Sequence, residues 1–382
     1  MKRKKNISKK VWRFCFLTII LFFGWSCVQT KTYAKETEKN PEQEIMDRID
    51  WNDMDYVVEE KSFKEIVQMF LDGDIKGVVK LSGEVVKEQV FSVLTENKKA
   101  LLHMLMIALM AAVFVNFSHV FSGKQVADTG FFILYLSLIT ILLKSFDVMM
   151  DAVSASLLTL TDFMRALCPA YLLVSSVVAG STTSVLFYNL ILFLIFLVET
   201  IMLHVILPLI HIYMIIRILD YLSPEPYLAR FAELIDMVIK WTLKTILIGV
   251  AGVNIIQGLI SPALDAVRRS GLQKGIEAIP GVGQAIGGMT EVVLSTVVLI
   301  KNGIGMAGAV VCVVICIVPI FQIAVMSLSY KCIAALAEPV SDKRIVGCIA
   351  AAGDGAVHLL KTVYTSAVLF LITIVVVASF RT

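Results

Sequence analysis

Residues 303–328 read GIGMAGAVVCVVICIVPIFQIAVMSL, and this stretch decides the class of the fold because it contains no charged residue. About 20 consecutive apolar residues suffice to cross the hydrocarbon core of a bilayer as a helix. Comparable stretches recur along the chain at 100–122, 130–150, 188–216, 241–260 and 358–380. The sequence therefore predicts an all-α, polytopic helical membrane protein with six to eight transmembrane helices.

The composition of the 382-residue chain agrees with this prediction. Hydrophobic residues make up 58% and charged residues 17%, whereas soluble domains carry about 25% charged residues. The mean hydropathy is +0.82. The net charge is only +3, and its cations gather at the N-terminus instead of forming a phosphate-binding stripe. These values exclude a soluble enzyme, a disordered chain and a nucleic-acid binder.

The N-terminus has the pattern of a secretion signal. Lysines and arginines up to Arg13 precede an apolar run from Phe14 to Val28, and Thr32-Tyr33-Ala34 follows. A basic region, an apolar region and small residues before the cleavage point predict a signal peptide over 1–34. An uncleaved signal anchor is the alternative. In both cases residues 35–99 are expected outside the cytoplasmic membrane.

The segment 35–99 is expected to form amphipathic helices. One helical face comes from apolar residues at i, i+3, i+4, i+7 and i+8, namely Phe63, Ile66, Val67, Phe70 and Leu71. After the break at 72–74, a second face is predicted from Val78, Leu81, Val85, Phe91 and Leu94. These faces must pack on each other, on the membrane surface or on a partner protein, and the sequence does not choose among them.

An internal repeat is expected to organise the membrane part. Ile206-Leu207-Pro208 matches Ile317-Val318-Pro319, and Leu243-Lys244-Thr245 matches Leu360-Lys361-Thr362. We predict two tandem copies, 151–262 and 265–378, after an N-terminal hairpin over 100–150. Each copy also holds a weakly apolar stretch, at 169–187 and 280–300. If these stretches do not cross the membrane, there are six spans and the repeats are parallel. If they cross, there are eight and the repeats are inverted, as in many transporters.

Two polar segments are expected as loops between spans, at 217–240 and 331–357. The chain has no Gly-x-Ser-x-Gly, His-Glu-x-x-His or P-loop motif, and its seven cysteines form no Cys-x-x-Cys pair. We therefore expect no catalytic residue, no cofactor and no metal site.

Two groups of residues are candidates for function inside the membrane. The first group is glycines that would either pack helices closely or line a pore or gate: Gly281, Gly283, Gly287, Gly288, Gly303 and Gly305. The second is the intramembrane polar residues Glu199, His204 and His211. Ionisable groups are costly against lipid, so these three are expected to face the bundle interior, an aqueous path or an interface. A proton relay through Glu199 and His204 is the functional interpretation, and buried structural residues are the other.

The order of short motifs resembles the stage III sporulation protein AE family of endospore-forming bacteria. The motifs are Ser181-Thr182-Thr183, Ile279-Pro280-Gly281-Val282-Gly283, Lys301-Asn302-Gly303-Ile304-Gly305, Tyr330-Lys331, Ala334-Ala335 and Glu338-Pro339. The resemblance covers nearly the whole chain beyond residue 45. It departs from the family pattern at Gly281, where a bulkier residue is typical, and at Glu338, where glutamine is typical.

This resemblance implies a role in sporulation and no enzymatic activity. It places the chain in the mother-cell membrane around the engulfed forespore, in a secretion-like channel complex needed for late forespore gene expression. The implied partners are the other products of the same operon, AA to AH, with AA as the ATPase, and the forespore protein Q. Membrane lipid is also a partner, and a homo-oligomer is an option. A secondary transporter and a non-conducting scaffold are the alternatives.

Overall fold

The structure is a computed structural model of the chain. It describes the backbone of 62–84, 124–179, 181–222, 227–276, 283–339 and 341–379, with scattered positions between 46 and 110. Within these helices, the side chains of 124–128, 131, 175–187, 257–294 and 377–379 are not described. The predicted signal peptide at 1–34 and most of the predicted span at 100–122 lie outside the described residues.

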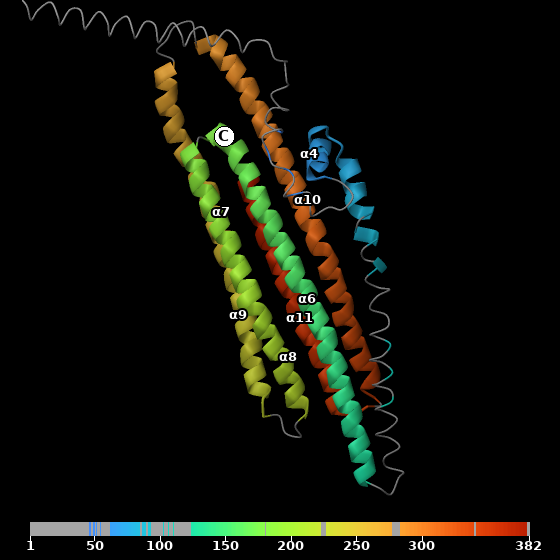
Figure 1. The fold of residues 1–382 in the computed structure, drawn as a ribbon. Helices are drawn as coiled ribbons and strands as arrows, with labels where there is room; N and C mark the ends of the chain where they lie inside the picture. Colours follow the sequence, from blue (N-terminus) through green and yellow to red (C-terminus); the bar gives the residue numbers. More distant parts are fainter. Residues whose placement is uncertain are drawn as a thin grey trace, which may run out of the picture. The chain divides into compact units, whose positions relative to one another are not determined.

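Every regular element of the described chain is a helix (Figure 1). This confirms the predicted all-α class. A five-residue π-helix, η1, interrupts the run from α7 to α8 and ends two residues before Pro208, which has no N–H to donate to the preceding turn. The elements are α4 Phe63–Leu71, α6 Lys124–Ala179, α7 Ser181–Ile201, η1 Met202–Ile206, α8 Leu207–Leu222, α9 Ala229–Ile276, α10 Gly283–Ala337 and α11 Lys343–Ser379.

Four helical stretches among the described residues are long and apolar enough to cross a membrane, judged by length and composition. They are Phe132–Val174, Tyr188–Leu222, Ser295–Ala337 and Lys343–Val376. These stretches support a polytopic membrane protein and overlap four of the six predicted spans. The predicted span at 241–260 lies inside α9, which is not among the four.

Several helices are much longer than a bilayer is thick. α6 has 56 residues and α10 has 55, which correspond to about 84 and 82 Å at 1.5 Å per residue, against a hydrocarbon core of about 30 Å. The weakly apolar stretches belong to these long elements and are not helices of their own. Residues 169–187 contain the end of α6 and the start of α7, and 283–300 continue without a break into the rest of α10.

The prediction that 217–240 and 331–357 are polar loops is wrong. Residues 217–222 end α8 and 229–240 begin α9, while 331–337 end α10 and 343–357 begin α11. Only the short connections 223–228 and 338–342 lie between these helices. The charged side chains that suggested loops instead form contacts along and between helices. A side-chain hydrogen bond bridges the first of these connections, because the Asp220 carboxylate accepts the Leu228 N–H at 2.9 Å.

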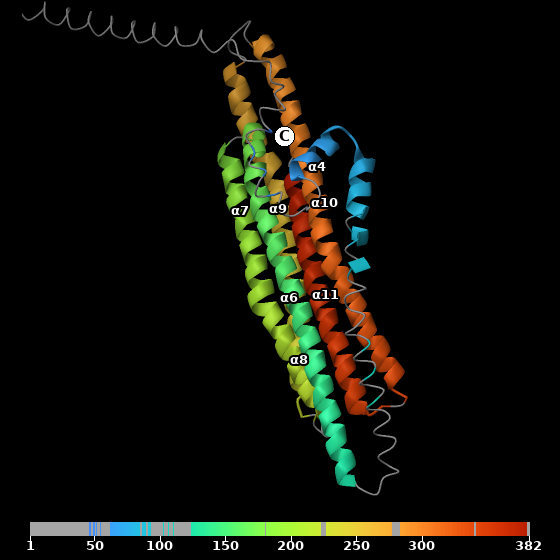
Figure 2. The ribbon, with the colours of Figure 1, turned by 45° about the vertical axis from the view of Figure 1, so that its right-hand side comes forward.

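The two hairpins, α8–α9 and α10–α11, turn at the same end of the bundle (Figures 1 and 2). The segments that the predicted repeat equates therefore run in the same direction, as the parallel, six-span arrangement requires. The helices do not break at the predicted copy boundaries, because residue 151 lies within α6 and residues 262–265 lie within α9.

Helix α11 is the centre of the bundle and packs against α10, α8, α9 and α6 (Figure 2). Its first half is rich in small residues that let neighbouring helices approach closely. A Cβ at Gly353 would lie 3.1 Å from Cγ of Lys331 on α10, and one at Gly355 would lie 2.9 Å from the Phe146 ring on α6. A Cβ at Gly347 would overlap the Tyr221 ring on α8.

The amphipathic segment before the bundle is part of the same packed unit. Ser62 caps α4 by accepting the Lys64 N–H at 3.3 Å, and Phe63 and Val67 are fully buried. The helix ends before Gly73, whose φ of +77° favours glycine, and residues 75–84 are helical again. This confirms the first predicted helix.

The second predicted amphipathic helix is confirmed only in part. Val78 is buried as predicted, but Phe91 is exposed. Val85 and Leu94 lie outside the described residues.

Candidate functional site

The sequence left open which surface covers the amphipathic segment, and the structure assigns it to α10 and α6. The Phe63 ring meets the Phe163 ring of α6 edge-on, with centroids 5.8 Å apart. On α10, a Cβ at Gly303 would lie 3.1 Å from Cδ2 of Leu71 and 3.7 Å from Cγ1 of Val67. Gly303 is thus a position at which α4 packs closely against α10.

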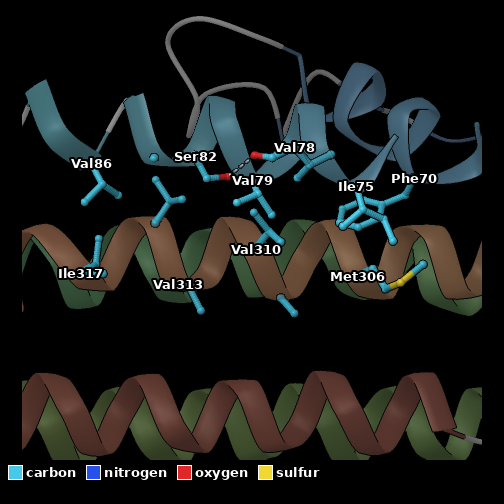
Figure 3. A pocket seen from close by; sticks show the side chains of 13 residues that line it. Phe70, Ile75, Val78, Val79, Ser82, Val86, Met306, Val310, Val313 and Ile317 are labelled. Carbon is cyan, nitrogen blue, oxygen red and sulfur yellow. Dashed lines mark hydrogen bonds between the residues drawn. The ribbon is translucent and has the colours of Figure 1, made fainter. Parts of the chain in front are cut away.

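Beside this contact, an apolar groove of about 610 Å³ runs between residues 70–86 and the α10 face from Met306 to Ile317 (Figure 3). Val79 and Val310 come from its two walls. The hydroxyl of Ser82 is turned back on its own helix, where it donates to the Val78 carbonyl at 2.9 Å. The groove can therefore accept apolar groups and offers them no free polar side chain among its lining residues.

The structure places the described candidate glycines in helix packing. Gly303 lies under α4, and Gly305 is buried. The nearby Gly308 faces α6, where a Cβ would lie 2.9 Å from Cδ2 of Leu167. Gly281 lies outside the described residues. Gly283, Gly287 and Gly288 belong to α10, at positions whose surroundings are not described.

Glu199 forms an ion pair that the sequence reading missed. Its carboxylate pairs with the guanidinium of Arg165 on α6. Arg165 also lies 3.6 Å from the Asp162 carboxylate, one turn earlier on its own helix. The Glu199 side chain is only 15% exposed, whereas that of Asp162 is 71% exposed. Arg165 therefore joins α6 to α7 and compensates a largely buried carboxylate.

The two histidines of the same span are not brought together with Glu199. His204 is exposed and lies in η1. His211 is half-buried, with its Nδ1 3.8 Å from Oδ1 of Asp147 on α6 and its ring edge-on to Phe146. Within the described residues, no ion pair links Glu199 to His204, so the structure offers no support for a relay through this pair.

A second polar cluster, which sequence reasoning did not find, lies where α8, α9 and α11 meet. Nε2 of His358 on α11 is 2.9 Å from Oδ1 of Asp236 on α9, and Lys240 Nζ is 2.6 Å from Oδ2 of the same carboxylate. The Tyr213 ring of α8 stands edge-on to the His358 imidazole at 5.0 Å. One turn earlier on α11, Asp354 pairs with Lys331 of α10 at 3.2 Å.

The carboxylates of this cluster can be seen in the sequence, but the sequence pattern placed them in loops. Asp236 and Asp354 fall in the segments predicted as loops, and a loop assignment implies no partner on a neighbouring helix. Over the described helices, no three His, Cys, Asp or Glu side chains converge as metal ligands would. Cys312 and Cys316 are buried and free.

These elements define the class of protein: a polytopic helical membrane protein whose long helices are packed through glycines around α11, with an amphipathic helix seated on α10. The chain belongs to the stage III sporulation protein AE family, whose model matches residues 61–380. This membership indicates a role in sporulation. A similar protein, the stage III sporulation protein AE of Bacillus subtilis (strain 168), is 22% identical over 283 residues, which cover 74% of this chain and 71% of that protein. No solved structure matches the chain.

Proposed function

We propose that this chain is a membrane component of a secretion-like channel complex between the mother cell and the engulfed forespore, and that it is needed for late forespore gene expression. The observation that carries the proposal is the family match over 61–380, which extends from the amphipathic helix α4 through the last membrane helix. The proposed location is the mother-cell membrane that surrounds the forespore.

The length of the helices supports a role that reaches beyond the bilayer. A core of about 30 Å accounts for roughly 20 residues of a helix, and α6 and α10 have 56 and 55. α4 packs in the half of the bundle in which α6 ends and α10 begins, and α10 extends beyond it (Figure 2). If the segment before the bundle is extracytoplasmic, this end of the bundle stands in the space between the two membranes.

The proposed partners are the other products of the A operon, AA to AH, and the forespore protein Q. Within this complex the chain serves as a conduit subunit or as a scaffold. The packing of Gly303 and Gly308 against side chains of α4 and α6 favours the scaffold, because glycines that hold helices together do not line an open path in a single copy.

Affinity purification of the full chain from detergent-solubilised membranes of sporulating cells tests membership of the complex. We expect the A-operon proteins to co-purify after engulfment and to be absent from a matched preparation of vegetative cells expressing the same tagged chain. Recovery of the chain alone from sporulating cells, with the partners present in the starting membranes, would contradict the proposal.

A further inference from the structure

The contact between α9 and α11 holds a buried histidine that the proposed function does not use. The side chain of His358 is only 4% exposed, and its Nε2 lies 2.9 Å from the Asp236 carboxylate. Lys240 binds the other oxygen of that carboxylate at 2.6 Å. Asp236 is therefore shared between a cation on its own helix and an imidazole on the neighbouring one.

The chemistry of this pair decides which histidine nitrogen exchanges a proton. An ionised carboxylate only accepts hydrogen bonds, so Nε2 carries a hydrogen whether the imidazole is neutral or charged. The proton must therefore be gained and lost at Nδ1. This nitrogen is buried and has no hydrogen-bond partner in the described part of the chain.

The charges that act directly on His358 are balanced, because the carboxylates of Asp236 and Asp354 are matched by Lys240 and Lys361. α6, which also packs on α11, carries Asp147, and that carboxylate pairs with His211 of α8. The other charged and titratable groups are Asp236 and Lys240 on α9, Tyr213 and Arg217 on α8, Asp354 and Lys361 on α11, and Lys331 on α10. Protonation of Nδ1 would add another positive charge. It would also create a buried N–H without an acceptor, which costs about 1–3 kcal/mol.

We propose that Nδ1 of His358 is a proton-binding site coupled to the contact between α9 and α11. In the closed contact the imidazole is neutral. A proton from water binds Nδ1 when the contact opens and the nitrogen becomes hydrated, and it returns to water when the contact closes. Only the N–H bond forms and breaks, and Asp236 keeps its bond from Lys240 throughout. Acid therefore favours the open contact.

The rest of the α9–α11 interface makes such opening a local event. Among the described residues, these helices also share the hydrogen bond from Asn254 Nδ2 to Thr373 Oγ1, at 3.1 Å. Asn254 lies 18 residues beyond Asp236, or about 27 Å along α9. The α9 segment around Asp236 can consequently separate from α11 while this distant bond holds.

Spin labels on the full-length protein in lipid nanodiscs test the proposal. Native cysteines are replaced, and labels are placed at the exposed Arg230 on α9 and Lys343 on α11. We expect the population with the longer distance to grow as the pH falls from about 8 to about 5, by up to about tenfold per pH unit for one coupled proton.

Three variants separate the proposed site from general effects of acid. His358→Gln retains a donor for Asp236 and cannot titrate, so its distance distribution should not change with pH. His211→Gln, at the half-buried partner of Asp147, should keep the wild-type response. Asp236→Asn, which removes the negative charge, should shift the midpoint to more acidic pH. An unchanged pH response in His358→Gln, or an equal loss in His211→Gln, would overturn the proposal.

Discussion

Gly303 in α10 and Leu71 in α4 are in such close contact that a Cβ at residue 303 would lie 3.1 Å from Cδ2 of Leu71. This spacing is tighter than ordinary van der Waals contact, so a Cβ at residue 303 requires the Leu71 side chain to shift by a few tenths of an ångström, and a longer side chain would push against α4. The relationship joins two parts of the sequence that look unrelated, an amphipathic helix before the bundle and an apolar helix within it. The amphipathic helix is consequently a fixed part of the bundle.

Replacing Gly303 by leucine should loosen α4. We expect a loss of roughly 1–3 kcal/mol in unfolding free energy, as for other overpacked sites, and faster proteolysis at the exposed turn 72–74. Gly249→Leu is the matched control, because a Cβ there meets nothing within 4 Å and the gain in helix propensity is the same. Equal free energies of unfolding for the two variants, measured with denaturant, would contradict the account. Adding Leu71→Ala to Gly303→Leu should recover part of the lost stability.

Gly355 should tolerate a side chain even less. A Cβ there would lie 2.9 Å from Cε2 of Phe146 on α6 and 3.4 Å from Sδ of Met214 on α8, so three helices meet at this point. We expect Gly355→Leu to lower the melting temperature more than Gly303→Leu, and Gly252→Leu, with open space at its Cβ, to have little effect. A thermal melt of Gly355→Leu that overlays the wild type would rule out the proposed packing of α11.

Breaking the pair between Arg165 and Glu199 should destabilise the hairpin of α6 and α7. Arg165→Ala leaves a carboxylate of which only 15% is exposed, and we expect a cost of about 1–3 kcal/mol. Asp162→Ala removes a carboxylate that is 71% exposed and should cost less. Thermal melts of both variants compare the two costs. We expect Glu199→Arg to raise the melting temperature of Arg165→Glu. A double variant that melts no higher than the single variants would argue against the pairing.

The two hairpin connections should lie on the same side of the membrane. Cysteines at the exposed residues Tyr227 and Glu338, in a chain without its native cysteines, should react with the same impermeant reagent from one side only. A cysteine at the exposed Asp72, at the other end of the bundle, should react from the opposite side. Labelling of residues 227 and 338 from opposite sides would instead support inverted repeats.

Much of the membrane architecture could be predicted from the sequence because apolar runs and helical periodicity are local properties. The helix at 63–71 and the apolar spans are of this kind. The continuity of α6 and of α10 could not be predicted, because polar residues such as Asp162 and Lys331 interrupt apolar runs without interrupting the helix. Asp162 is compensated by Arg165 on the same helix and Lys331 by Asp354 on α11, and a partner on another helix cannot be identified from a single sequence.

The candidate site was predicted less well, for the same reason. Gly303 was identified as a helix-packing or pore-lining glycine, but its partner Leu71 is distant in the sequence. Glu199 was identified without Arg165. His358 was missed because Asp236 was assigned to a loop, and a histidine at the start of an apolar run shows no pattern until the opposite helix is known.

The most direct test of the proposed function is a clean deletion of the gene in the sporulating source organism, scored with a late forespore-specific reporter after engulfment. The account predicts engulfed forespores with a silent reporter, and recovery of the signal when the wild-type gene is returned. Normal spores with an active reporter in the deletion strain would contradict the proposed role in the channel complex.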